Sequence, residues 1–387
     1  MKFFKGFKNI FWREVKRLFT IQDLLLICLI APFGYGIVLS SVYYHKRVDN
    51  LPVGIVDQDN TRLSRNFIRS IDATENVAIR ERYPDARAAV NDMVAGKLVG
   101  LLYIPRGFSS DIKSGKDAMA LVSINSVNFM VANPVMQSLL EVSNTMSAGI
   151  FVTSARKKGV AEEKAMALTQ PLVLDTRPIF NPQMNYSDFF IPGLLLMIIQ
   201  QISLVGLGYT VAEERENGRE EELRALCGGN IIALFFGKTL PYAIVNYCIS
   251  LAFLFMILPV FDITVQSSMA GVLALLALFI GALTAFGVMI STFFRSVVMS
   301  LIVLMFYSMP VFLISGAVWP VFSLPLPIRL LSYLFPTTYF LIDFRMLILG
   351  NVPFRYALNS CVALLLFGLV CGTIACILFK QLVKKQK

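Results

Sequence analysis

The sequence predicts an α-helical polytopic membrane protein with six transmembrane helices and an inserted external α/β domain. Two observations predict this class. Of the 387 residues, 56% are hydrophobic and the mean hydropathy is +0.67, which is too apolar for a soluble globule of this length. The apolar residues also gather into six segments of membrane length, and the polar block 45–187 separates the first of these from the second.

Each of the six segments reaches the roughly 20 apolar residues that a helix needs to cross the hydrocarbon core. Backbone groups in lipid must be paired within their own segment, so we expect helices rather than isolated strands. The expected spans are 24–44, 189–212, 231–260, 269–294, 297–318 and 357–379. With their flanks, they place the first transmembrane helix at 23–44 and the other five within 188–380.

Basic residues beside the spans predict that both termini, including the tail 381–387, are cytoplasmic. The bases at the two ends of the chain are Lys2, Lys5, Lys8, Arg13, Lys16, Arg17, Lys380, Lys384, Lys385 and Lys387. The turn after the fourth span contains Arg295, whereas the turn after the third contains Asp262 and no base. The positive-inside rule then places the block 45–187 outside. Much of the net charge of +10 belongs to these flanks, so we assign it to anionic lipid and expect no nucleic-acid partner.

The segment 1–22 predicts an amphipathic helix in the cytoplasmic interface. Bases alternate there with Phe4, Phe7, Ile10 and Trp12, among other apolar residues, which at helical spacing gives a basic face and an aromatic face. Both a simple membrane anchor and a contact with a partner fit this pattern.

The external block predicts one compact domain of alternating strands and helices. The expected strands are 51–59, 77–83, 99–105, 118–125 and 171–181. The expected helices are 62–73, 85–96, 107–115 and the helix-rich stretch 129–169. None of the six cysteines lies in this block, so we expect no disulfide there. Asp57, Asp59 and Asn60 do not follow the calcium-loop pattern and predict a solvated turn, and we expect no metal site.

Six glutamates crowd the loop between the second and third spans, at 212–230. They are Glu213, Glu214, Glu216, Glu220, Glu221 and Glu222. Because anionic lipid repels such a segment, it points into the cytoplasm or into a protein partner. Glu213, Glu216 and Glu220 fall at helical spacing. From the residues alone, a solvated loop and a partner-binding helix remain equally open.

Four short motifs follow one another in an order typical of one family. The first is ERENGREEEL at 214–223. The others are Gly237-Lys238 with Pro241-Tyr242, Ser315-Gly316 with Trp319-Pro320, and Pro336 to Phe340 with Arg345. Together with the six spans and the external domain, they resemble the permease subunits of ABC-2 type transporters. Those subunits have threonine where this chain has Arg219, and a proline that is absent near 227–229.

The resemblance implies an ATP-driven exporter of a drug, a lipid or an envelope component in a bacterial inner membrane. It implies that Glu213, Glu214, Glu216, Gly218, Glu220, Glu221 and Leu223 couple the chain to a cytoplasmic ABC ATPase subunit. The further partners it implies are a second permease copy or paralogue and an external adaptor protein. This chain would bind no cofactor, and ATP and Mg would lie on the ATPase subunit.

The chain itself is not expected to be an enzyme. The stretch GGNIIALFFGKT at 228–239 ends like a phosphate-binding loop, but Ile232 stands where that loop requires glycine. ATP hydrolysis therefore requires a separate polypeptide.

Polar residues within the spans are the candidates for a transport pathway, although many such residues only join helices. The candidates are Gln200, Gln201 and Asn246. Lys238 lies near the cytoplasmic end of its span, from where we expect it to reach the interface. The proline-rich stretch 319–355 predicts a re-entrant or interfacial helical hairpin at the external face.

Three other classes of protein were weighed against the exporter. A receptor with an external sensor domain would have no ATPase partner. An ion-coupled carrier usually needs a carboxylate within its spans, and the six spans contain none at mid-membrane depth. A membrane-embedded hydrolase would need a cluster of histidines or carboxylates there. The exporter permease therefore remains the main prediction, with the receptor as its alternative.

Overall fold

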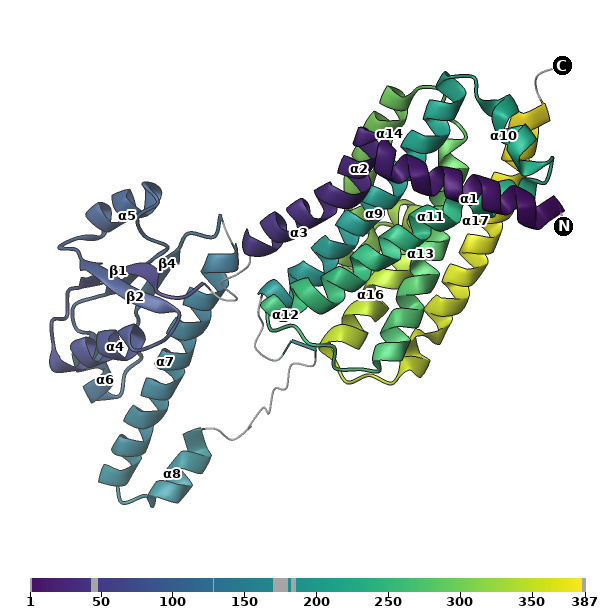
Figure 1. The fold of residues 1–387 in the computed structure, drawn as a ribbon. Coiled ribbons are helices and arrows are strands. Elements are labelled where there is room, and N and C mark those ends of the chain that lie inside the picture. The colour runs from purple at the N-terminus through teal and green to yellow at the C-terminus, as the bar shows by residue number, and fades with distance from the viewer. Residues whose placement is uncertain (1, 43–47, 128, 170–179, 182–185, 385–387) are drawn as a thin grey trace. The chain divides into compact units, whose positions relative to one another are not determined.

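The computed structural model describes residues 2–42, 48–127, 129–169, 180–181 and 186–384 (Figure 1). Within them the chain forms two compact units, one of residues 1–46 and 177–387 and the other of residues 47–176. We call the first the membrane unit, because its described residues include six helical segments long and apolar enough to span a bilayer. We call the second the external unit, after the side of the membrane that the sequence predicts for it. The predicted fold class is confirmed.

Each of the six segments coincides with one predicted span. They are Gln22–Val42, Tyr186–Glu216, Ile231–Val260, Met269–Ser291, Val297–Ala317 and Phe354–Gln381. The first comprises α2 (Gln22–Leu25), the π-helical turn η1 (Leu26–Ile30) and α3 (Ala31–Val42), and the second is α9 (Tyr186–Glu216). The third comprises α11 (Ile231–Ala252), η2 (Phe253–Ile257) and α12 (Leu258–Val260), and the fourth is α13 (Met269–Ser291). The fifth comprises α14 (Val297–Phe312) and η3 (Leu313–Ala317), and the sixth comprises η5 (Phe354–Ala357) and α17 (Leu358–Lys384).

The second span is longer than its apolar sequence predicts. Helix α9 continues through four further residues to Glu216, and the left-handed Gly218 (φ +62°) then turns the chain before α10 (Glu220–Cys227). The helical spacing expected from Glu213 through Glu216 to Glu220 is therefore wrong. Glu213 and Glu216 lie on the end of α9, whereas Glu220 begins a separate helix.

The stretch 319–355 enters the middle of the membrane unit and returns. It contains η4 (Val321–Ser323), α15 (Leu326–Ser332) and α16 (Pro336–Leu349). At the start of α16, the Thr337 hydroxyl donates to Gln200 in the middle of α9. At its end, the carbonyl of Ile348 accepts the N–H of Gln266, in the turn between α12 and α13, at 3.0 Å. Whether this stretch is re-entrant or interfacial in a bilayer stays a prediction.

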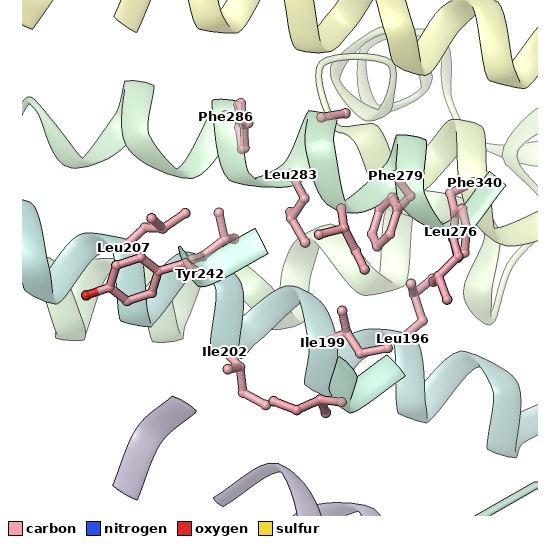
Figure 2. Close-up of a cluster of buried hydrophobic side chains, with 14 of the residues drawn as sticks. Leu196, Ile199, Ile202, Leu207, Tyr242, Leu276, Phe279, Leu283, Phe286 and Phe340 are labelled. Carbon is pink, nitrogen blue, oxygen red and sulfur yellow. The ribbon is translucent and has the colours of Figure 1, made fainter. Parts of the chain in front are cut away.

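Large apolar side chains fill the space between α9 and α13. Figure 2 shows Leu276, Phe279 and Leu283 of α13 facing Leu196 and Ile199 of α9. The ring of Phe340 from α16 stacks on Phe279 with the ring centroids 4.2 Å apart. This core positions α9, on which half of the predicted functional residues lie.

Helix α1 (Lys2–Thr20) crosses the bundle instead of joining it, as Figure 1 shows. Its closest neighbours are α11 and α10. Contact with α10 is tight at Gly6, where an added Cβ would stand 2.8 Å from the carbonyl oxygen of Cys227. Glycine at position 6 therefore allows the two backbones to approach each other.

The external unit is built on a mixed sheet of four strands. They are β1 (Leu51–Asp57), β2 (Val77–Arg82), β3 (Gly100–Ile104) and β4 (Leu121–Ile124), in the order β2-β1-β3-β4. Strand β1 is parallel to β2 and β3, and β4 is antiparallel to β3. Each of the four lies within a predicted strand.

Helices cover both faces of this sheet. One face packs on α4 (Arg62–Asp72), α6 (Phe108–Ser114) and α7 (Phe129–Lys157) through a core that includes Val53, Ile68 and Val135. The other face packs on α5 (Ala86–Val94) through Val56, Ala89 and Leu101. After α7 comes α8 (Glu162–Thr169). The fifth predicted strand, 171–181, lies outside the described residues except for Phe180 and Asn181, which are not in a strand.

Candidate functional site

The buried face of α1 joins apolar and ionic residues, and does not match the basic and aromatic faces predicted for it. Ile10, Glu14 and Leu18 recur four residues apart and are all buried, with Arg17 beside them. Phe4 and Trp12 point outward and are 75% and 60% exposed. The face of α1 that packs against the helix bundle therefore contains Glu14, which is the one acidic residue among the first 20.

Six charged side chains from three helices meet beneath this face. We call them the charge cluster, and they are Arg13, Glu14, Arg17, Glu213, Glu214 and Lys238. The cluster contains three cations and three anions, so its formal charges balance. Such a balance is the condition under which charges can be buried without a large penalty.

Glu214 and Glu14 are the centre of the charge cluster. The Lys238 ammonium donates to Glu214 at 2.5 Å and to Glu14 at 3.2 Å. The Arg17 guanidinium donates to Glu214 at 2.6 Å and also to Glu213. Arg13 donates to Glu214 at 2.5 Å. The last turn of α9 is therefore tied to α1 on one side and to α11 on the other.

Lys238 is fully buried, so the expectation that it reaches the interface is wrong. The physical reason is that two carboxylates meet its ammonium inside the protein. The second oxygen of Glu14 accepts hydrogen bonds from the hydroxyls of Thr210 at 3.0 Å and Tyr242 at 3.3 Å. Burial by itself would raise the pKa of Glu14, but Lys238, Arg17 and Arg13 together lower that pKa to about 2.

The acidic turn that follows α9 lies on the surface. Glu216, Gly218, Glu221 and Glu222 are exposed, and Glu220 is half-buried. Leu223 is buried and anchors α10. Arg13 also reaches Glu222 of α10 at 3.3 Å. The turn is therefore a protruding acidic surface that is anchored to the charge cluster at its base.

Arg215 and Glu216 hold the turn between α13 and α14 from opposite sides. Arg215 donates to the carbonyl of Phe294 at 2.8 Å, just beyond the end of α13. Glu216 accepts the backbone N–H of Val297, the first residue of α14, at 2.8 Å. A cation at a helix C-terminus and an anion at an N-terminus both suit the helix dipole. A movement of the α9 terminus would therefore be transmitted to α13 and α14 through these two hydrogen bonds.

The structure thus divides the predicted coupling residues into two groups. Glu213 and Glu214 are engaged within the chain by α1 and α11. Glu216, Gly218 and Glu221 are exposed in the acidic turn together with the half-buried Glu220, and the buried Leu223 anchors α10. Whether either group contacts an ATPase stays a prediction.

The predicted pathway residues lie on two different helices. Gln200 of α9 is buried and accepts the hydroxyl of Thr337, while its Nε2 has no partner among the described residues. Gln201 is only partly buried, and Asn246 of α11 is buried. The amide oxygen of Gln200 therefore joins α9 to α16, whereas its Nε2 is unused among the described residues.

The carboxylates of Asp57 and Asp59 in the external unit are engaged by hydrogen bonds from nearby backbone and hydroxyl groups. Asp57 accepts the N–H of Asn60 at 2.9 Å and the hydroxyl of Ser64 at 2.8 Å. Asp59 accepts the N–H of Gly107 at 3.1 Å. Within the described ranges, no group of three or more potential ligand residues is placed to hold a metal ion.

A sequence model of the ABC-2 family transporter proteins matches residues 23–377. The chain therefore belongs to the ABC-2 family of transporters, as the four motifs predict. It is similar over nearly its whole length to permeases of Escherichia coli (strain K12). By family it is a transport component of a bacterial inner membrane.

Two of these relatives are described as probable multidrug ABC transporter permeases. YbhS is 25% identical over 90% of this chain and 89% of its own length, and YbhR is 23% identical over 91% and 92%. The inner membrane transport permease YhhJ is 22% identical over 97% of each chain. The linearmycin resistance permease protein LnrN of Bacillus subtilis (strain 168) is 29% identical over 27% of this chain.

Sequence reasoning missed Glu14 and did not assign Lys238 to it. A signal was present in each case. Glu14 is the lone carboxylate in a basic helix, and it lies four residues from both Ile10 and Leu18. Lys238 is the lone base within its span. An unmatched charge in an apolar or oppositely charged setting favours a buried partner.

Proposed function

We propose that this chain is the membrane-spanning subunit of an ATP-driven exporter whose ATPase is a separate cytoplasmic subunit. The chain would work with a second permease copy or paralogue, since six spans correspond to half of a translocation pathway. ATP and Mg would be bound by the ATPase subunit. The proposed cargo is a hydrophobic or amphipathic molecule, which agrees with the description of YbhS and YbhR as probable multidrug permeases.

The observation that carries this proposal is the anchored acidic turn. Glu216, Glu221 and Glu222 project from the surface, yet the base of the turn is joined to α1 and α11 by buried ion pairs. Exposed charges give a contact register and specificity more than raw affinity. We assign ATPase contact to the exposed group, and transmission into the bundle to Glu213 and Glu214.

We place the pathway along α9 and α14, with the corresponding helices of the second permease. Three buried hydroxyls on these helices have no hydrogen-bond partner among the described residues, and they belong to Ser203, Ser300 and Ser308. Gln200 adds its free Nε2 to the same set. Buried polar groups are normally paired, so these four unpaired groups support polar contact with a passing molecule.

The test is affinity purification of the tagged chain in mild detergent, with ATPase activity measured on the eluate. Glu220→Ala combined with Glu221→Ala should release a co-purifying ATPase subunit and its activity. Glu163→Ala is the control, because it removes an exposed glutamate from the external unit. If the double variant retains the ATPase, the coupling surface lies elsewhere. If the wild-type chain purifies without an ATPase, the receptor alternative is favoured.

A further inference from the structure

Arg345 of α16 is a cation without a carboxylate partner among the described residues. Its Nη1 donates to the carbonyl of Ala317 at 2.9 Å, and its guanidinium carbon lies 4.4 Å from the centroid of the Phe189 ring. Its Nε and Nη2 are shielded from solvent and have no hydrogen-bond partner among the described residues. A carbonyl and an aromatic face satisfy only part of what a guanidinium can donate.

The surroundings of this guanidinium are shaped to admit it. Position 193 of α9 is glycine, and an added Cβ there would stand 2.5 Å from Nη2 of Arg345. Gly316, beside the accepting carbonyl of Ala317, has a left-handed backbone (φ +91°) that ends the fifth span. The absence of a side chain at Gly193 therefore makes room for the guanidinium.

Arg345 lies at the end of the membrane unit that the sequence predicts to be external. The two residues after Met346, Leu347 and Ile348, accept backbone N–H groups from the turn between α12 and α13. Gly193 is seven residues into α9, about 10 Å along the helix axis from its start. This depth suits the headgroup of an amphiphile whose apolar part lies deeper in the bundle or the bilayer.

We propose that Arg345 and the surrounding Phe189, Gly193 and Ala317 form a binding subsite for the anionic headgroup, a phosphate or carboxylate, of an amphiphile. An ionisable side chain at membrane depth is usually functional, and a guanidinium offers two parallel N–H groups to such an oxyanion. The free Nε and Nη2 are the adjacent pair that this geometry requires. Where the amphiphile is the cargo, the inference rests on the proposed export function and narrows its cargo to acidic amphiphiles.

The test compares lipid binding by wild-type chain and variants. The purified full chain in a neutral maltoside detergent is titrated with dioleoylphosphatidylglycerol or dioleoylphosphatidylcholine, and bound lipids are counted by native mass spectrometry. Wild type should prefer phosphatidylglycerol. Arg345→Gln should weaken the binding of phosphatidylglycerol by about tenfold, which is the factor expected for one charge-assisted contact. It should also abolish the preference for this lipid over phosphatidylcholine. Arg345→Lys should keep part of the preference, since the charge remains but the paired donors do not.

Arg355→Gln is the matched control, because Arg355 is an exposed arginine that follows α16 at the predicted external end. Its loss should leave the preference unchanged. The proposal is overturned if Arg345→Gln, purified as a monodisperse folded chain, keeps the wild-type preference. It is also overturned if Arg355→Gln loses the preference equally, since only general surface charge would then be involved.

A second measurement distinguishes the source of the headgroup. ATP turnover of the chain with its co-purified ATPase is measured with dodecyl phosphate and with dodecyl maltoside. Stimulation by the phosphate alone, lost in Arg345→Gln, supports an exported acidic amphiphile. Phosphatidylglycerol binding without such stimulation supports a resident bilayer lipid. If no ATPase co-purifies, the proposed function fails, whereas the lipid titration still decides the subsite.

Discussion

The two ends of the membrane unit treat buried charge in opposite ways. At the end that holds α1, three cations and three anions pair with one another, and the central Glu14, Glu214 and Lys238 are almost fully shielded. At the other end, Arg345 has a carbonyl and an aromatic ring but no carboxylate among the described residues. Within the described part of the chain, at the first end each charge has an opposite charge beside it and one donor, Arg17 Nε, is unused, whereas at the second end Nε and Nη2 of Arg345 are both unused.

This difference separates two uses of ionic residues within one bundle. Matched charges join helices and give the α9 terminus a defined position between α1 and α11, and their removal should therefore change stability. An unmatched charge contributes less to stability, and its unused hydrogen-bond donors can still bind a ligand. The predictions that follow compare these two uses, beginning with the largest expected effect.

Lys238→Met should destabilise the chain by about 3–5 kcal/mol, because it leaves Glu14 and Glu214 buried with one cation fewer. Thermal unfolding of the purified chain in detergent measures this, and Lys380→Met is the control, since Lys380 is exposed. Combining Lys238→Met with Glu14→Gln restores the charge balance and should recover part of the loss. Strictly additive effects of the two changes would contradict direct coupling between these side chains.

Acid should remove the stabilisation that Glu14 provides. Its pKa in the folded chain is about 2, against an ordinary value of 4.5. A carboxyl whose folded pKa is lowered stabilises the fold above its unfolded pKa, and this stability is lost as pH falls from about 4.5 toward 2. The full difference corresponds to about 3 kcal/mol.

Melting temperatures of wild type and Glu14→Gln, measured from pH 6 down to pH 3, check this. The advantage of wild type should shrink on acidification. Glu163→Gln, which changes an exposed carboxyl, should follow wild type throughout. A gap between wild type and Glu14→Gln that stays constant with pH would show that the ionised carboxylate is not what stabilises the cluster.

Gly193→Ala should have the smallest effect on stability, less than about 1 kcal/mol, because the added methyl would clash only with the end of the Arg345 side chain and would otherwise make an ordinary contact with Phe312. It should still displace the guanidinium and lower the preference for phosphatidylglycerol. Gly281→Ala is the control, since an added Cβ there meets no atom within 4 Å. A large loss of stability in Gly193→Ala would indicate that Arg345 is held rigidly and serves the fold.

Much of the architecture was readable from local patterns. The six spans and four of the strands were predicted because apolar length and residue alternation are properties of a segment and need no knowledge of its neighbours. The ABC-2 family was predicted from short motifs in a fixed order. The exact end of α9 was not, because the partners of its last glutamates lie on α1, α11 and α14, far away in the sequence.

The sequence by itself therefore determined the membrane class, the inserted α/β domain and the family. Only the tertiary structure decided which charges are paired. Glu14 and Lys238 are 224 residues apart in the chain and meet at 3.2 Å, whereas Arg345 meets no carboxylate among the described residues. Hydropathy and motifs report what a segment prefers, but the free energy of a buried charge depends on the few atoms around it, and folding brings those atoms from distant parts of the chain.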